Sequence, residues 1–263
     1  MDLTTIGGLA ATVAIIIVVL IMDGGSPAEL FAHPSAILLT FVGALVATII
    51  TVPLEAAIAI PQALMKAFFG AKHNAREAID QIAVMADKAR REGLLALEEE
   101  SRSIEDAFLK KGIMLVVDGI EPEQVRSILE LDIVHMQERH AVKYGIFNAA
   151  GGFSPTFGII GTVMGLISVL KSLSDPDALA KSIAAAFLAT LWGLMSANLV
   201  FLPIGGKLSN KSHEEAAYRH MLLEGIIALQ AGENPRLIRD KLLAFLPPKE
   251  RKSEEEMAGE VGA

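Results

Sequence analysis

Residues Phe147 to Leu170 read FNAAGGFSPTFGIIGTVMGLISVL, an uncharged run of 24 residues. As a helix rising about 1.5 Å per residue, it is long enough to cross roughly 30 Å of hydrocarbon. Small residues recur along it, and Gly161 and Gly165 have the spacing that lets two membrane helices approach closely. The run therefore predicts a membrane span that packs against another helix.

The same run carries polar features that a simple hydrophobic anchor lacks. Ser154, Thr156 and Thr162 supply hydroxyl groups, and Pro155 removes a backbone donor. A carbonyl freed in this way is tolerated in hydrocarbon only where protein or a water-lined cavity satisfies it. The span is therefore expected to line a polar site within a helical assembly.

Three further uncharged runs accompany this one in a chain of 263 residues that is 52% hydrophobic. Each clears the roughly 18 residues expected of a membrane-spanning helix. The four predicted spans are Leu3 to Met22, Pro34 to Leu54, Tyr144 to Leu170 and Ser182 to Gly206. The predicted fold is an all-α polytopic membrane protein with four transmembrane helices.

The basic residues predict the orientation. Residues 55–143 hold 12 of the 23 Lys and Arg, and residues 207–263 hold another 9. The short loop from Asp23 to His33 has none. The positive-inside rule then places the long loop, the C-terminal tail and both termini in the cytoplasm.

Four segments follow from this pattern. Residues 1–54 form a transmembrane hairpin, residues 55–143 a cytoplasmic helical domain, residues 144–206 spans three and four, and residues 207–263 cytoplasmic C-terminal helices with a charged tail. The last residues, rich in charged and small side chains, are expected to be disordered.

Helix signals recur in the cytoplasmic domain. Asn74 with Glu77 three residues later predicts a capping box, and Gly93 an end to that helix. A second helix is expected to start at Glu98 and to end at Lys111, before Gly112, an order of charges that suits the helix dipole. Pro122 then begins a long helix that leads into span three, and Asn234–Pro235 begins another in the tail.

The chain carries no nucleophile–base arrangement, phosphate-binding loop or metal-ligand cluster, and it has no cysteine. Neither an enzyme nor a bound cofactor or metal is therefore expected. None of the four spans has an Asp, Glu, Lys, Arg or His in its middle, although ion-transporting membrane proteins normally place such a group there. Either a partner helix supplies the acid, or the prolines are simple kinks and the hydroxyls bond their own helix.

Four stretches together resemble the MotA/PomA family, the A subunits of the bacterial flagellar motor stator. These are ARREGLLALEEE in the long loop, SPTFGIIGTVMGLI in span three, LATLWGLMSANLVFLPIGGKL in span four, and LLEGIIALQAGENPRLIRDKLLAFLPP in the tail. The resemblance implies inward cation flow coupled to torque in the cell inner membrane. It also implies a single-span MotB/PomB-type partner carrying a membrane aspartate, a pentamer of A subunits around a dimer of that partner, and contact with the rotor switch protein FliG.

The resemblance also implies roles for particular residues. Arg90, Arg91, Glu98 and Glu99 match the charges that face the rotor, although composition alone would make them a solvated charge run. The residues that match the lining of the ion path are Thr162, Thr190, Pro155 and Pro203. Gly158, Gly161 and Gly165 are expected to serve helix packing.

The resemblance leaves two ions and two other classes of protein open. Thr162 aligns with a threonine of sodium-type members where proton-type members often have alanine, which favours Na⁺ over H⁺. An ExbB/TolQ-like energiser of the cell envelope would pair with a similar partner, but such proteins resemble a plan with one hydrophobic segment before the large loop. A membrane scaffold without ion flux would leave Pro155, Pro203 and the hydroxyls unexplained.

Overall fold

The computed structural model describes residues 3–69 and 74–251, and within these ranges all regular structure is helical. The chain separates into two compact units. Of the described residues, 3–69 and 139–211 form the first, and 74–138 and 212–251 form the second. The predicted disordered tail from residue 252 lies outside the described residues.

The first unit begins with two apolar helical segments joined by a short turn. Its helices before residue 70 are α1 (Leu3–Met22), η1 (Pro27–Phe31), α2 (Pro34–Ile37), η2 (Leu38–Val42), α3 (Gly43–Ile50), α4 (Leu54–Ile58) and α5 (Ile60–Phe69). η2 is a π-helical turn between α2 and α3. Since the three run on from one another, span two is the continuous segment Pro34–Ile50, and α1 matches the predicted span one.

Spans three and four lie in long helices that extend past the membrane-type segments. α9 (Pro122–Lys171) contains span three and is helical throughout, Pro155 included. Span four runs through α10 (Pro176–Met195), the π-helical turn η4 (Ser196–Phe201) and the start of α11 (Leu202–Gln230). Pro122–Lys171 and Pro176–Gln230 are long and apolar enough to cross a membrane, and Gly7–Met22 and Pro34–Ile50 are shorter apolar helices.

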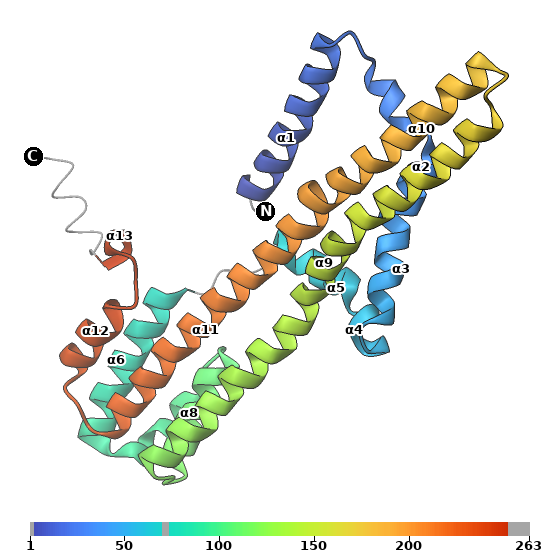
Figure 1. The fold of residues 1–263 in the computed structure, drawn as a ribbon. Coiled ribbons are helices and arrows are strands. Elements are labelled where there is room, and N and C mark those ends of the chain that lie inside the picture. The colour runs from blue at the N-terminus through green and yellow to red at the C-terminus, as the bar shows by residue number, and fades with distance from the viewer. Residues whose placement is uncertain (1–2, 70–73, 252–263) are drawn as a thin grey trace, which may run out of the picture. The chain divides into compact units, whose positions relative to one another are not determined.

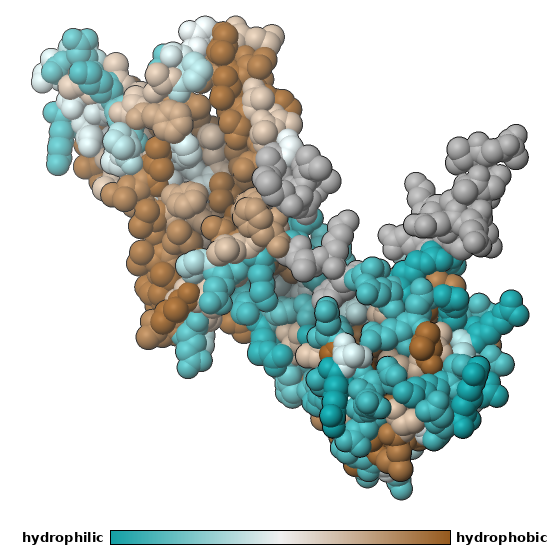
Figure 2. Space-filling model, turned by 180° about the vertical axis from the view of Figure 1, so that it is seen from behind, coloured by the Kyte–Doolittle hydropathy of each residue, from teal (hydrophilic) through white to brown (hydrophobic). Residues whose placement is uncertain are grey.

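The surface of the first unit is what a lipid environment requires. Figure 2 shows hydrophobic residues gathered over its helices and mainly hydrophilic ones over the second unit. The exposed apolar side chains on α9 include Ile159, Val163 and Ile167, each at least half exposed. Because water would penalise such a face, this unit is built for hydrocarbon and protein contacts.

Residues 55–69 group with the membrane-type helices, although the sequence placed them in the cytoplasmic domain. Ala63 and Ala67 of α5 are buried in one cluster with Phe147 of α9 and Phe201 of η4. Lys211 strengthens this attachment by donating from its Nζ to the carbonyl of Lys66 at 2.7 Å and to that of Ala67 at 3.0 Å. An ammonium at a helix C-terminus satisfies carbonyls that lack a helical donor.

The second unit is a helical bundle with an apolar core. It holds α6 (Ala75–Glu92), η3 (Leu94–Ala96), α7 (Leu97–Ser101), α8 (Ala107–Val117), the start of α9, the end of α11, α12 (Pro235–Leu243) and α13 (Pro248–Arg251). Figure 1 shows α6, α8, α11 and α12 gathered side by side in this bundle. Its fully buried side chains come from every long helix: Ile79, Ile82, Leu109, Ile113, Leu129, Ile133, Leu222 and Ile226.

Several predicted helix ends in this unit are confirmed, and one prediction is wrong. Asn74 caps α6 by accepting from the backbone N–H of Glu77, and Gly93 ends α6 at φ 89°. The predicted single helix from Glu98 to Lys111 is two helices, because Asp106 starts α8 by accepting from two backbone N–H groups at 2.9 Å. Gly112 does not end a helix. It lies inside α8, where the side chain of Ile226 packs against its backbone.

Candidate functional site between spans three and four

Glycines allow α9 and α10 to pack with their backbones in contact. A Cβ built on Gly193 would lie 2.9 Å from the carbonyl oxygen of Ser154 and 3.0 Å from the Cα of Gly158. One built on Gly158 would lie 3.1 Å from the carbonyl oxygen of Ala189. These distances leave no room for a larger residue, so the small residues of the two spans fix the pairing that Figure 1 shows.

Gly161 and Gly165 continue the same contact along α9. The Cβ of Ala189 would lie 2.5 Å from a Cβ on Gly161, and that of Ala186 2.6 Å from a Cβ on Gly165. Three glycines at helical spacing therefore face one stretch of α10, in the packing arrangement expected of them.

Thr162 and Thr190 meet across this contact. The two hydroxyls are hydrogen-bonded to each other, and Thr162 Oγ1 also lies 3.0 Å from the carbonyl oxygen of Gly158 and 3.3 Å from that of Ala186. Both threonines are half-buried. Thr162 thus contacts a carbonyl of its own helix and the facing helix as well, which gathers hydroxyl and carbonyl oxygens at one position in the membrane.

The two prolines differ in setting. Pro155 lies within α9, one helical turn before Gly158, and is half-buried. Pro203 is the second residue of α11, and Leu202 alone separates it from the π-helical turn η4, in which each backbone hydrogen bond spans five residues. The N–H of Leu202 donates to the carbonyl of Ala197, five residues earlier. A π turn beside a proline shifts the hydrogen-bond pattern where the proline N–H is missing.

A second hydroxyl pair in the same unit was only half anticipated. Ser154 Oγ lies 2.5 Å from Ser196 Oγ, and both side chains are buried. Ser154 was noted as a hydroxyl in span three, but Ser196 was not singled out. The sequence showed Ser196 only as a small polar residue in span four. Its pairing with Ser154 depends on how spans three and four are aligned, which the structure shows.

The four predicted rotor-facing charges lie in the second unit, at the end of α6 and the start of α7. All four are exposed, as a solvated surface requires. Arg91 pairs with Asp87 at 2.7 Å, and Glu98 lies 3.9 Å from Arg102. Asp87 and Arg102 each lie four residues from the side chain that they contact, so both ion pairs are local. Arg91 and Glu98 therefore stay at the surface of the second unit.

Lys88 and Glu100 connect α6 to α7 beside those charges. Their Nζ and Oε1 atoms are 2.7 Å apart, and the hydrogen bond to Glu100 raises the pKa of Lys88 above its usual value. A shallow groove of about 350 Å³ lies here, with Leu95, Glu98 and Glu99 on its wall. The ion pair holds the acidic start of α7 next to the basic end of α6.

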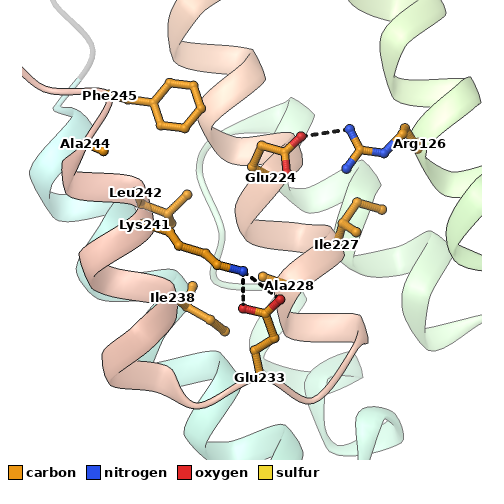
Figure 3. Close-up of a pocket in the computed structure, with 10 residues that line it drawn as sticks. All are labelled: Arg126, Glu224, Ile227, Ala228, Glu233, Ile238, Lys241, Leu242, Ala244 and Phe245. Atoms are coloured by element: carbon orange, nitrogen blue, oxygen red, sulfur yellow. Dashed lines mark hydrogen bonds and ion pairs between the residues drawn. The ribbon is translucent and has the colours of Figure 1, made fainter.

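A larger pocket, of about 600 Å³, lies between α9, α11 and α12 of the second unit (Figure 3). Its floor is apolar, and its charged groups form two pairs. Arg126 Nη1 lies 2.7 Å from Glu224 Oε1, and Lys241 Nζ lies 2.6 Å from Glu233 Oε2. The hydrogen bond from Arg126 lowers the pKa of Glu224 and raises that of Arg126. These pairs fasten α11 to α9 and α12 to the preceding turn.

Across residues 3–69 and 74–251, no group of three or more His, Asp or Glu side chains is arranged to hold a metal ion. The polar groups between the two closely packed spans are uncharged: they are hydroxyl and backbone carbonyl oxygens. Such a fold defines a polytopic helical membrane protein in which two closely packed spans bring hydroxyl and carbonyl oxygens together.

Comparison with known proteins agrees with this class. The model of the MotA/TolQ/ExbB proton channel family matches residues 100–221. Motility protein A of Treponema pallidum (strain Nichols) is 35% identical, with 96% of each chain covered. Chemotaxis protein PomA of Vibrio alginolyticus is 36% identical over 94% of this chain and 96% of its own.

Solved stator complexes have the same fold. The C. jejuni MotAB structure superposes with a TM-score of 0.91 at 34% identity, covering 97% of this chain and 100% of its own. The flagellar MotAB stator complex of Bacillus subtilis gives 0.88 at 35% identity, covering 95% and 98%. The chain belongs to the MotA/PomA family, and it is an inner-membrane stator subunit of the bacterial flagellar motor. These relatives favour the stator over the ExbB/TolQ-like alternative.

Proposed function

We propose that Thr162 and Thr190 line the cation path of this stator subunit, and that the cation is Na⁺. The supporting observation is the convergence of two hydroxyls with the carbonyl oxygens of Gly158 and Ala186. A sodium ion requires several oxygen ligands, whereas a proton needs only an acid and a water. The family description speaks of proton channels, which makes H⁺ the competing choice.

The acid itself comes from a partner. Spans three and four carry no ionisable side chain in their middle, so a MotB/PomB-type single-span subunit supplies a membrane aspartate opposite the threonines. Two solved relatives are MotAB complexes, which supports this pairing. Five copies of this chain surround a dimer of the partner, both termini lie in the cytoplasm, and the chain works as an ion-path subunit and not as an enzyme.

Torque reaches the rotor through the second unit. Arg90, Arg91, Glu98 and Glu99 contact the switch protein FliG, which is consistent with their exposure on neighbouring helical turns. Pro155 and Pro203 supply the bends that spans three and four need as the cation binds and leaves. Pro155→Ala and Pro203→Ala are expected to assemble in the membrane and yet to generate little torque.

The choice of ion is tested in a motile host that lacks its own stators and expresses this chain with its native partner. External sodium is exchanged for potassium at fixed pH while rotation is recorded. Rotation that stops without sodium supports the proposal. Undiminished rotation that a protonophore abolishes shows that protons drive the motor.

The matched variant is Thr162→Ala, with Ser168→Ala as its control. Ser168 lies on the same helix, is exposed, and its hydroxyl donates to the carbonyl of Met164 in its own helix. Loss of an oxygen ligand is expected to raise the sodium concentration needed for half-maximal rotation in the Thr162 variant alone. Equal behaviour of both variants would remove Thr162 from the path.

A further inference from the structure

A hydroxyl cluster joins three membrane segments at a position distinct from the Thr162–Thr190 pair. Ser154 Oγ of α9 lies 2.5 Å from Ser196 Oγ of η4 and 3.1 Å from the carbonyl oxygen of Thr40 in η2. Ser196 Oγ lies 2.6 Å from the carbonyl oxygen of Trp192 and 3.2 Å from that of Gly193, both in its own span. Ser154 is 0% and Ser196 2% exposed, so the cluster is sealed from water and does not belong to a water-lined path.

The two serines have two hydroxyl protons for four contacts. In one arrangement Ser196 donates to Ser154, and Ser154 donates to the carbonyl of Thr40. In the other, Ser154 donates to Ser196, and Ser196 donates to the carbonyl of Trp192. The first arrangement ties α9 to span two, and the second replaces that tie with a bond inside span four.

Both neighbours of Ser154 in this cluster lie in π-helical turns. Thr40 is inside η2, and Ser196 is the first residue of η4. π turns interrupt the regular α-helical ladder and occur frequently at functional sites. The hydroxyl pair therefore lies where spans two and four depart from regular helix, and it directly precedes Pro155 of span three.

A rigid connection links the cluster to the threonines. Ser154, Gly158 and Thr162 follow one another at four-residue spacing on one face of α9. Gly158 contacts the backbone of Gly193, which itself contacts the carbonyl of Ser154. A rotation of α9 at Ser154 would thus be transmitted to Thr162 two turns away.

We propose that Ser154 and Ser196 are positioning residues whose reversible hydroxyl bridge holds span three against span two and thereby sets the spacing of Thr162 from Thr190. The proposal rests on the cation site proposed above. Ser154→Ala removes both arrangements and leaves α9 without its tie to span two. Ser196→Ala keeps only the bond from Ser154 to Thr40 and so locks the first arrangement.

The test measures motor speed per incorporated stator against the external concentration of the driving cation, in the stator-less host with the native partner. A fluorescent tag counts incorporated stators, so a variant that fails to assemble is recognised. Ser154→Ala is expected to raise the half-saturating concentration about fivefold, the effect of one lost hydrogen bond, with near-normal speed at saturation. Ser196→Ala is expected to lower the saturating speed at an unchanged half-saturating concentration.

Two comparisons make the result decisive. Ser154→Cys retains a weak donor and is expected to fall between wild type and Ser154→Ala, whereas Ser168→Ala should match wild type. If Ser154→Ala leaves the half-saturating cation concentration unchanged while Thr162→Ala shifts it, the hydroxyl bridge is overturned and the cation site is not. No shift in either variant contradicts the cation site itself.

Discussion

Gly193 makes a close backbone contact between spans three and four, since an added Cβ would press on the carbonyl of Ser154 and on Gly158. Backbone atoms cannot rotate away as a flexible side chain can. Gly193→Ala is therefore expected to destabilise the assembled complex by about 1–3 kcal/mol. Thermal unfolding of the purified complex in detergent measures this.

Gly152→Ala is the matched control, because Gly152 is exposed on α9 and nothing lies within 4 Å of an added Cβ. Its melting temperature should stay the same or rise slightly, as alanine favours helix over glycine. A Gly193 variant that melts with the Gly152 variant would show that this backbone contact is not required.

The spacing of Gly158, Gly161 and Gly165 indicated one packing face of span three, and in the structure all three face α10. The sequence did not predict a role for Ser196, because its partner Ser154 is 42 residues away. A single serine in an apolar run does not show which residue of a neighbouring helix lies opposite it. Pairing across antiparallel helices needs the crossing point, which local pattern does not contain.

The helices of the second unit were predictable where a cap or proline acts locally. Helices α6 and α12 begin at their predicted caps, Asn74 and Asn234, α9 begins at the predicted Pro122, and α6 ends at Gly93. The prediction that a helix ends before Gly112 was wrong, because a glycine after two lysines has the pattern of a helix end. Its actual role is to leave space for Ile226, a contact between segments more than a hundred residues apart.

The ion pair that fastens α9 to α11 has a predictable dependence on pH. Arg126 lowers the pKa of Glu224 below its ordinary 4.5, so the folded state favours the ionised carboxylate. The pair's contribution is present above pH 4.5 and is lost as the pH falls through the lowered pKa. Because both side chains are more than a third exposed, solvent screening limits the contribution to at most about 1 kcal/mol.

Glu224→Gln tests this pair. Its melting temperature is expected to lie below that of wild type near neutral pH and to converge with it in acid, as wild-type Glu224 becomes protonated. The control Glu123→Gln changes an exposed carboxylate at the start of α9. A constant gap between wild type and Glu224→Gln at every pH would contradict the assignment.

The whole molecule combines a unit of apolar, membrane-type helices with a second, largely hydrophilic helical bundle. The sequence predicted both from charge-free runs and from basic residues. Residues 55–69 group with the membrane-type helices in the structure, because Ala63 and Ala67 of α5 pack on Phe147, although α5 has the amphipathic pattern of a soluble helix. Propensity alone does not show which unit an amphipathic helix joins.

Charge reversal in the second unit tests rotor contact. Arg90→Glu and Glu98→Lys are expected to reduce swimming at unchanged membrane levels, and the double reversal to reduce it further. Each exposed charge pair contributes less than about 1 kcal/mol, so single reversals should impair motility only in part. Glu123→Lys is the control for an exposed charge placed elsewhere. Normal swimming of the double variant would rule out these charges as the rotor contact.

The stator function, and the proposed passage of the driving cation along spans three and four, are tested together by recording the rotation of single flagellar motors. The host lacks stators and expresses this chain with its native partner. We expect the speed to rise in steps as stator units join the motor. We expect rotation to be lost when the cation gradient is collapsed or when Thr162 and Thr190 are both replaced by alanine. Motors that stay still, although both proteins are assembled in the membrane, would contradict the stator function.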